Sequence, residues 1–298
     1  MTDEEYLKKI LQSQTLDENG KEMKELRSRR EDVERLLRKK FGSAPSIRYG
    51  GSKAKGTMVK ENYDLDVICY FDNEDNCAGE TLQEIYESVE DVFEGDYLVE
   101  RKSSALRLKS RSFDNWAQDL RVDIVPGRFV GDEREDVFLY RSSGEKGRQK
   151  TNLDVHINHV KNSGVIDGIR LTKLWRVRNN LSVRNFILEL LAIELLKEKK
   201  NFKLTEQLAH FWTRLRDNVE DIQIEDPANP TGNDLSELFN ATIKFELSNA
   251  ARTALETAEN EGWEKIFGAL PEEKSQNNYP SIIIHGRNVT PQSDFGED

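Results

Sequence analysis

Two aspartates open the most strand-like run of the sequence, DLDVICYF at residues 64–71. Its apolar, β-branched and aromatic residues predict a strand packed on at least one side. Strand side chains alternate between two faces at about 3.3 Å per residue, so Asp64 and Asp66 share one face about 6.6 Å apart along the backbone. Strands are depleted in aspartate, and a buried carboxylate needs a compensating partner. The pair therefore predicts a cation site, and its hard oxygen ligands favour Mg²⁺ or Mn²⁺.

A glycine-serine turn precedes this strand, in the stretch YGGSKAKGT at residues 49–57. Gly50 and Gly51 allow the backbone to approach a ligand closely, and Ser52 offers a hydroxyl and a main-chain N–H to a phosphate. Asp-x-Asp and Gly-Ser each occur often by chance in surface loops, so neither is specific alone. Their combination predicts a site for a nucleoside triphosphate.

A third carboxylate, Asp123, lies inside another strand-like run, DLRVDIVP at residues 119–126. Two alternating runs at 97–102 and 105–111 precede it and predict further strands. One interpretation is a structural ion pair between Asp123 and Arg121 or Arg107. The other is a third metal ligand, which we favour because its strand is expected near the first two aspartates.

Composition limits the class of protein. With 298 residues, 36% hydrophobic and 33% charged, the chain is long enough for two domains with a sizeable core. No apolar run approaches the roughly 20 residues of a membrane span, and the acidic start MTDEEYLKKI is unlike a signal peptide, so we expect a cytoplasmic protein that does not enter a membrane. Cys69 and Cys77 lack a zinc-type partner pair. The net charge of −11 argues against long nucleic acid as a substrate and leaves small nucleotides.

These residues resemble the polymerase-β-like nucleotidyltransferases, whose pattern is a Gly-Ser turn, Asp-x-Asp on one strand and a third Asp on a later strand. Here the pattern is Gly51-Ser52, Asp64-Leu65-Asp66 and Asp123. The segments GSKAKGT, RVDIVPG and DPANPTGN, at 51–57, 121–127 and 226–233, resemble the branch that contains oligoadenylate synthase, archaeal CCA-adding enzymes and the bacterial CD-NTases (cGAS/DncV-like). TNLDVH, at 151–156, resembles the Thr-Asn-Pro-x-x-His segment of this branch with leucine in place of proline. The resemblance extends over residues 49–271.

The resemblance implies an α/β (α+β) fold with a mixed sheet and a helical second domain of the oligoadenylate-synthase type. We expect a catalytic core with an N-terminal helix at 1–150, a helical substrate-binding domain at 151–275 and a tail at 276–298 that contains one strand-like run, 281–285. Helical periodicity is present at 2–13, 21–41, 81–93, 168–179, 186–197 and 239–258. Asn233 or Asp234 is expected to cap a helix that starts near Leu235.

The resemblance also implies roles for single residues. Asp64 and Asp66 would hold two Mg²⁺ or Mn²⁺ ions, and Asp123 would hold the one that activates the attacking hydroxyl. Gly51, Ser52 and Lys173 would bind the triphosphate, with Ser182 as a weaker candidate. For Lys173 the alternative is an ordinary solvated helix face.

Two other groups of residues are more simply structural. His156 and His159 have no further ligands near them in the sequence, so we interpret both as structural histidines rather than metal ligands. The aromatic residues Trp175, Phe211 and Trp212 occupy apolar helical positions, where core packing is favoured over base stacking.

The function implied is synthesis of a cyclic di- or oligonucleotide signal from NTPs in bacterial anti-phage (CBASS) signalling, with an activating protein partner as a further possibility. Two alternatives stay open from the sequence. One is an RNA 3′-end nucleotidyltransferase of the CCA-adding type, which the acidic chain fits less well. The other is a catalytically silent nucleotide-binding regulator, against which the presence of all three aspartates speaks.

Overall fold

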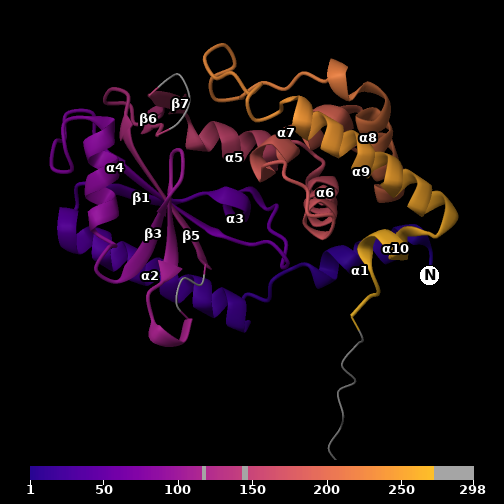
Figure 1. Ribbon diagram of the computed structural model, residues 1–298, viewed down its shortest axis with the longest axis horizontal. Helices are drawn as coiled ribbons and strands as arrows, with labels where there is room; N and C mark the ends of the chain where they lie inside the picture. Colours follow the sequence, from indigo (N-terminus) through magenta and orange to yellow (C-terminus); the bar gives the residue numbers. More distant parts are fainter. Residues whose placement is uncertain (116–118, 143–146, 272–298) are drawn as a thin grey trace, which may run out of the picture.

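The computed structural model describes residues 1–115, 119–142 and 147–271. A sheet-based half and a helical half lie side by side, with α3 and α5 between them (Figure 1). The strands are β1 Ser46–Tyr49, β2 Leu65–Phe71, β3 Tyr97–Arg101, β4 Leu106–Ser110, β5 Asp119–Phe129, β6 Val137–Tyr140 and β7 Arg148–Thr151. The α-helices are α1 Asp3–Ser13, α2 Lys21–Phe41, α3 Gly51–Lys55, α4 Leu82–Asp91, α5 Leu153–Lys161, α6 Ile166–Arg178, α7 Asn185–Leu196, α8 Leu204–Asn218, α9 Ala241–Asn260 and α10 Trp263–Phe267.

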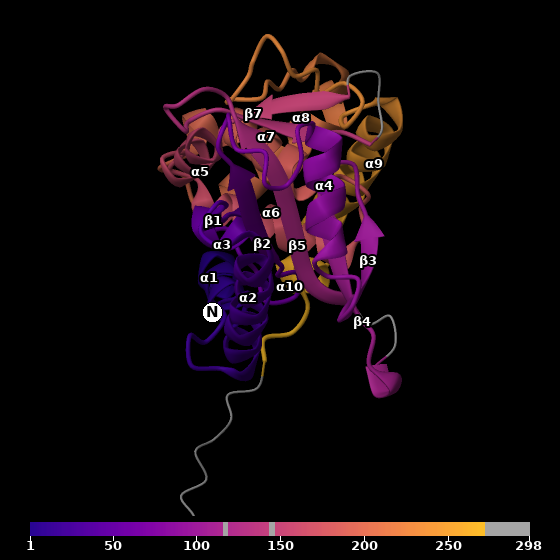
Figure 2. The same ribbon diagram turned by 90° about the vertical axis from the view of Figure 1, so that its left-hand side faces the viewer.

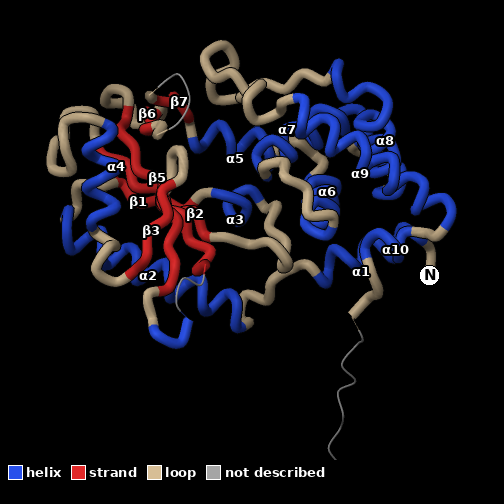
Figure 3. The backbone as a smooth tube through the Cα atoms, viewed as in Figure 1, coloured by secondary structure: helices blue, strands red, loops and turns tan. Residues whose placement is uncertain are grey.

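The sheet is mixed, as expected, and its main strand order is β1-β2-β5-β4-β3. Strands β2 and β5 are parallel, whereas β1, β4 and β3 join by antiparallel pairs, and β6 and β7 extend from the end of β5 (Figure 3). The predicted strands at 64–71, 97–102, 105–111 and 119–126 correspond to β2, β3, β4 and β5. Strands β6 and β7 were not predicted, because each has only four residues and β7 is the polar run RQKT.

One face of the sheet is covered by α2 and α4, which lie in front of it in Figure 2. Alternate residues of β2, Leu65, Val67, Cys69 and Phe71, pack into the buried cluster that these helices share with the sheet. Because side chains alternate along a strand, Asp64 and Asp66 belong to the opposite face. On that face, further along β2, Ile68 packs with residues of β5 and β6 in a smaller cluster.

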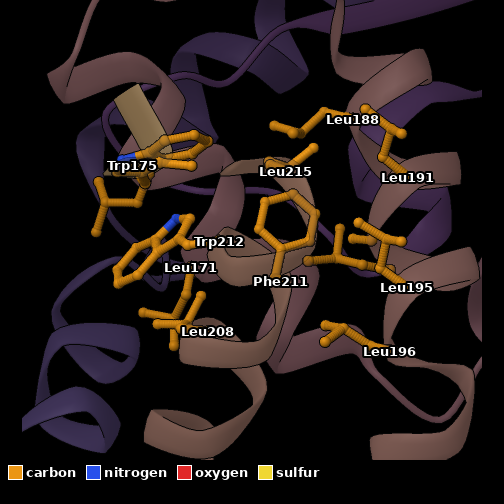
Figure 4. Packing of buried hydrophobic residues seen from close by; sticks show 14 of the residues in the cluster. Leu171, Trp175, Leu188, Leu191, Leu195, Leu196, Leu208, Phe211, Trp212 and Leu215 are labelled. Carbon is orange, nitrogen blue, oxygen red and sulfur yellow. The ribbon is translucent and has the colours of Figure 1, made fainter. Parts of the chain in front are cut away.

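The helical half has its own core, centred on Trp175 of α6 and on Phe211 and Trp212 of α8 (Figure 4). All three side chains are fully buried, so core packing, the interpretation favoured for them, is confirmed. The four buried residues of α1 also belong to this core, and the hydroxyl of Tyr6 donates to the Gly268 carbonyl at 2.6 Å. The first helix therefore packs on the helical half, although the sequence assigned it to the 1–150 unit; the domain boundaries themselves stay a prediction.

The loop before α9 differs from expectation. No helix starts at Leu235; α9 begins at Ala241, and the side chain of Asn240 accepts from the Ile243 N–H as its cap. Asn233 instead donates to the Asp226 carboxylate at 2.7 Å and to the Lys150 carbonyl at 2.8 Å. The capping prediction is wrong for both candidates, because these longer-range contacts use the Asn233 side chain and Asp234 accepts from the N–H and hydroxyl of Ser236 in a turn that no helix follows directly. The expected strand at 281–285 lies outside the described residues, and no helix among the described ranges is long and apolar enough to span a membrane.

Candidate active site

The three predicted aspartates lie together on the face of the sheet opposite α2 and α4. Asp66 of β2 is the direct register partner of Asp123 on the parallel strand β5, and Asp64 stands one residue before β2. On the other side of β5, Arg107 of β4 is the register partner of Asp123. Two carboxylates and a guanidinium thus form a row across three strands. Strand alternation predicts that Asp64 lies on the same face as Asp66.

The glycine-serine turn lies directly against Asp66. The Gly50 N–H donates to the Asp66 carbonyl at 3.0 Å, and Gly51 follows with φ +65° at the start of α3. A Cβ added to Gly51 would lie 1.7 Å from the Asp66 Oδ2 atom, so only glycine fits there. The role of Gly51 is therefore steric: the absence of a side chain allows the turn to approach the Asp66 carboxylate.

Ser52, the next residue, is 8% exposed. Its Oγ atom is buried and has no hydrogen-bond partner among the residues that the structure describes. A buried hydroxyl without a partner is costly, typically about 1–3 kcal/mol, and such groups are uncommon in folded proteins. The orphaned hydroxyl beside Asp66 is the feature expected of a ligand contact.

Asp123 is held by cations of the sheet. Arg107 donates to both of its carboxylate oxygens, each at 2.6 Å, and the Lys102 ammonium lies 3.3 Å away. The same guanidinium lies 3.7 Å from Asp64. The ion pair with Arg107, left open by the sequence, is thus present. Across the described ranges no three His, Cys, Asp or Glu side chains are gathered in a form that would hold a metal as they stand.

Burial and neighbouring carboxylates raise the pKa values of Asp64 and Asp66. Burial raises the pKa of Asp66 to about 7, and the charges of Asp64 and Asp123 add to the effect. Burial and the charge of Asp123 raise the pKa of Asp64, while Arg107 opposes them. Closely spaced carboxylates that are hard to ionise together are stabilised by a divalent cation. Together with the orphaned Ser52 hydroxyl, this donor set fits a site for Mg²⁺ or Mn²⁺ and a phosphate.

Lys173 is not on a solvated helix face, which removes that alternative: it is 1% exposed. Its ammonium donates to the Glu189 carboxylate at 2.9 Å and to the Thr57 hydroxyl and carbonyl at 3.1 and 3.3 Å. Glu189 of α7 also accepts from Lys55 of α3 at 2.8 Å and from the Thr57 hydroxyl at 2.6 Å. Lys55, Thr57, Lys173 and Glu189, hereafter the lysine–glutamate cluster, therefore tie the phosphate turn to the helical half.

Burial would raise the pKa of Glu189, but Lys173 and Lys55 outweigh it and hold the pKa at about 2. Sequence reasoning missed both Glu189 and Lys55. The signal for Glu189 was an acidic residue among the apolar residues of FILELLAIELLK, where a buried charge requires a partner; the second acidic residue of this run, Glu194, is exposed and pairs with Lys197.

Ser182 lies in the loop before α7 and is exposed. Its N–H and its hydroxyl both contact the Glu246 carboxylate of α9, at 3.0–3.2 Å. Because a carboxylate repels a phosphate, a phosphate contact from Ser182 would require Glu246 to move. The role of Ser182 stays a prediction.

His156 and His159 belong to α5, and His156 makes contacts typical of a structural residue. His156 Nε2 lies 3.1 Å from the Thr151 hydroxyl and 3.4 Å from the fully buried Asp226 carboxylate. Its ring packs against Phe186 in a T-shaped arrangement, with the ring centroids 5.2 Å apart. Burial lowers the pKa of His156 to about 4 despite Asp226, so the ring is neutral at pH 7. These contacts support the structural interpretation of His156.

No protein-family model and no curated protein sequence matches the chain. Solved structures do. The structure of E. coli MS115-1 CdnC with ATP matches with a TM-score of 0.66 at 21% sequence identity, and the match covers 90% of this chain and 98% of that chain. The structure of the E. coli MS115-1 CdnC:HORMA-deltaN complex matches with a TM-score of 0.64 at 20% identity, covering 91% of this chain and 99% of that chain. The Elizabethkingia meningoseptica CdnE cyclic dinucleotide synthase with GTP and Apcpp gives 0.64 at 14%, with 86% and 98% covered. The CD-NTase CdnG of Bradyrhizobium diazoefficiens with GTP gives 0.66 at 12%, with 86% and 91% covered. Since these matches extend over both halves of the molecule, the chain has the fold of the bacterial CD-NTases.

Proposed function

We propose that the chain is a nucleotidyltransferase that joins NTPs into a cyclic di- or oligonucleotide signal and releases pyrophosphate. The observation that carries the proposal is the site geometry. Asp66 and Asp123 are register partners on parallel strands with Asp64 beside them, and the turn with the orphaned Ser52 hydroxyl lies against Asp66. Solved structures with this fold include one named as a cyclic dinucleotide synthase with GTP and Apcpp.

Asp64 and Asp66 would hold both divalent ions, and Asp123 would hold one of them. Two Mg²⁺ or Mn²⁺ ions, when bound, supply activation of the attacking ribose hydroxyl and stabilise the charge on the α-phosphate. Because Arg107 donates to both oxygens of Asp123, coordination by Asp123 requires these hydrogen bonds to be exchanged for the metal. Ser52 would donate to the departing pyrophosphate, and the positive charge of Lys173 and its cluster would favour the negative phosphates.

The wider setting is part of the same proposal. We place the protein in the bacterial cytoplasm, in anti-phage (CBASS) signalling, with NTPs as its substrates. A structure named as a CdnC:HORMA-deltaN complex supports a protein partner for this chain, and we propose that this partner activates it. Activation by a partner would make the purified protein slow on its own.

The test is product analysis. Purified protein with all four NTPs and Mg²⁺ or Mn²⁺, without RNA, should release pyrophosphate and yield nucleotide products that resist phosphatase, because cyclisation removes the terminal phosphate. Nuclease digestion then identifies the bases and linkages. Asp123→Asn serves as the matched inactive control. Incorporation into added tRNA, with no cyclic product under any condition, would refute the proposal in favour of an RNA-extending enzyme.

A further inference from the structure

Lys55 lies at the end of α3, the short helix that begins with the phosphate turn. It is three residues after Ser52, so the two side chains project from the same side of this helical turn. The Lys55 side chain is 13% exposed, its ammonium donates to Glu189 at 2.8 Å, and it lies 5.9 Å from the centre of the Phe186 ring. Lys55 is therefore fixed at its position while still in contact with solvent.

The two lysines of the cluster differ in the hydrogen bonds that they have left. A lysine ammonium has three N–H donors. Those of Lys173 match three acceptors, the Glu189 carboxylate and the two Thr57 oxygens, and the side chain is 1% exposed. Within the described part of the chain, Lys55 has only the Glu189 carboxylate as a hydrogen-bond acceptor. Two donors of Lys55 thus stay available to a ligand, whereas Lys173 has none.

The net charge of the lysine–glutamate cluster also favours a phosphate contact at Lys55. The lysine–glutamate cluster contains two ammonium groups and one carboxylate, which leaves one net positive charge at a largely buried place. Thr57 is neutral and shares the same carboxylate. An anion next to Ser52 would be attracted to the accessible member of the cluster.

We infer that Lys55 is the lysine that contacts the terminal phosphates of the bound NTP, and that Lys173 is a positioning residue that holds Thr57 and Glu189 behind it. This inference rests on the proposed function and assigns a residue within it. It moves the phosphate contact from the lysine that resemblance suggests to its neighbour in the cluster. Glu189 is then the support that fixes Lys55 relative to Ser52.

The test uses a probe that does not depend on the base: inorganic tripolyphosphate with Mg²⁺, titrated into the full chain by calorimetry. Lys55→Met should raise the Kd at least about tenfold, the loss expected for a charge-assisted hydrogen bond. Lys53→Met is the matched control, because Lys53 is on the same helix, is half exposed and pairs with Glu18. It should change the Kd by less than about twofold. Lys173→Met should lower the melting temperature and change the Kd less than Lys55→Met does.

Lys55→Gln is the second variant if Lys55→Met does not fold, since it keeps an N–H for Glu189 while losing the charge; it should show the same loss. Unchanged binding in a folded Lys55 variant would overturn the inference, as would a tenfold loss in a Lys173→Met protein of wild-type stability. Pyrophosphate release from NTPs is measured on the same preparations. If wild-type protein releases pyrophosphate and the Lys55 variants bind tripolyphosphate as tightly as wild type, the role of Lys55 is refuted and the proposed function stands. Wild-type protein that neither binds tripolyphosphate nor releases pyrophosphate refutes both the inference and the proposed function.

Discussion

Glu189→Gln tests whether the lysine–glutamate cluster holds the two halves of the molecule together. The substitution keeps the shape of the side chain and removes its charge. Glu189 is 2% exposed and accepts from Lys55, Thr57 and Lys173. Without the carboxylate charge, a fully buried ammonium at Lys173 loses its counter-ion. The free energy of unfolding should therefore fall.

The size of this effect follows from the Glu189 pKa. Burial raises it, but the two lysines hold it at about 2, against an ordinary value of 4.5. At about 1.36 kcal/mol per pKa unit, the difference corresponds to about 3 kcal/mol. Removing one partner of a buried ion pair typically costs about 3–5 kcal/mol, which agrees. We expect Glu189→Gln to lower the free energy of unfolding at pH 7 by about 3 kcal/mol.

The lowered pKa of Glu189 also predicts how its contribution to stability changes with pH. Because the folded-state pKa is lowered, the stabilisation by Glu189 is present above pH 4.5 and is lost as the pH falls from 4.5 towards 2. The difference between wild type and Glu189→Gln should therefore be full at pH 7 and should shrink below pH 4.5. Urea unfolding followed by tryptophan fluorescence at pH 7 and pH 3.5 measures it.

Two further variants make this experiment specific. Glu194→Gln, on the same helix, removes an exposed carboxylate that pairs with Lys197 and should cost less than about 1 kcal/mol. Glu189→Gln with Lys173→Met should recover part of the loss, because the unpaired buried ammonium is removed as well. The role assigned to Glu189 would be refuted if Glu189→Gln and wild type had the same free energy of unfolding at pH 7, or if the difference between them were the same at pH 7 and pH 3.5.

Three other predictions concern the candidate site. Asp64→Asn, Asp66→Asn and Asp123→Asn should each abolish pyrophosphate release from NTPs. In EDTA the melting temperature of Asp64→Asn and Asp66→Asn should stay level or rise because like charges are relieved, whereas that of Asp123→Asn should fall because its ion pair with Arg107 is lost. Normal turnover in the triple variant would show the site to be elsewhere. Gly51→Ala should abolish turnover, since its Cβ would displace the Asp66 carboxylate, and Mn²⁺ titration should show weakened metal binding. Ser52→Ala should leave the fold intact and raise the Kd of Mg²⁺-tripolyphosphate by less than the Lys55 variants do, because it removes a neutral hydrogen bond.

The sheet side of the site could be predicted because strand geometry is periodic. A period of two places Asp64 and Asp66 on one face, and the apolar neighbours of Asp123 identify a buried strand without knowledge of its partners. The structure adds the parallel register between Asp66 and Asp123, which depends on chain topology and has no local signal. Arg107 was a candidate partner of Asp123 in the sequence, and its place opposite Asp123 is set by the same pairing.

The helical side of the site could not be predicted in the same way. Lys173 and Glu189 are separated by 16 residues, and Lys55 is 134 residues from Glu189. No periodicity connects residues on different helices, so the sequence shows isolated charges and not the cluster that they form. A charged residue on a predicted buried face signals that a partner exists, but it does not identify the partner.

The net charge of a whole chain does not predict the charge at one site. The chain carries −11, yet cations surround the three aspartates: Arg107 and Lys102 on the sheet side, and Lys55 with Lys173 on the helical side. In the proposed complex, the aspartates and these cations contact different parts of one ligand. A metal–nucleotide complex is positive at its ions and negative at its phosphates, so carboxylates on β2 and β5 and a net positive cluster behind α3 complement it at the same time. An acidic chain can therefore bind a polyanion, provided that its charges are separated over the few ångströms that separate metal from phosphate.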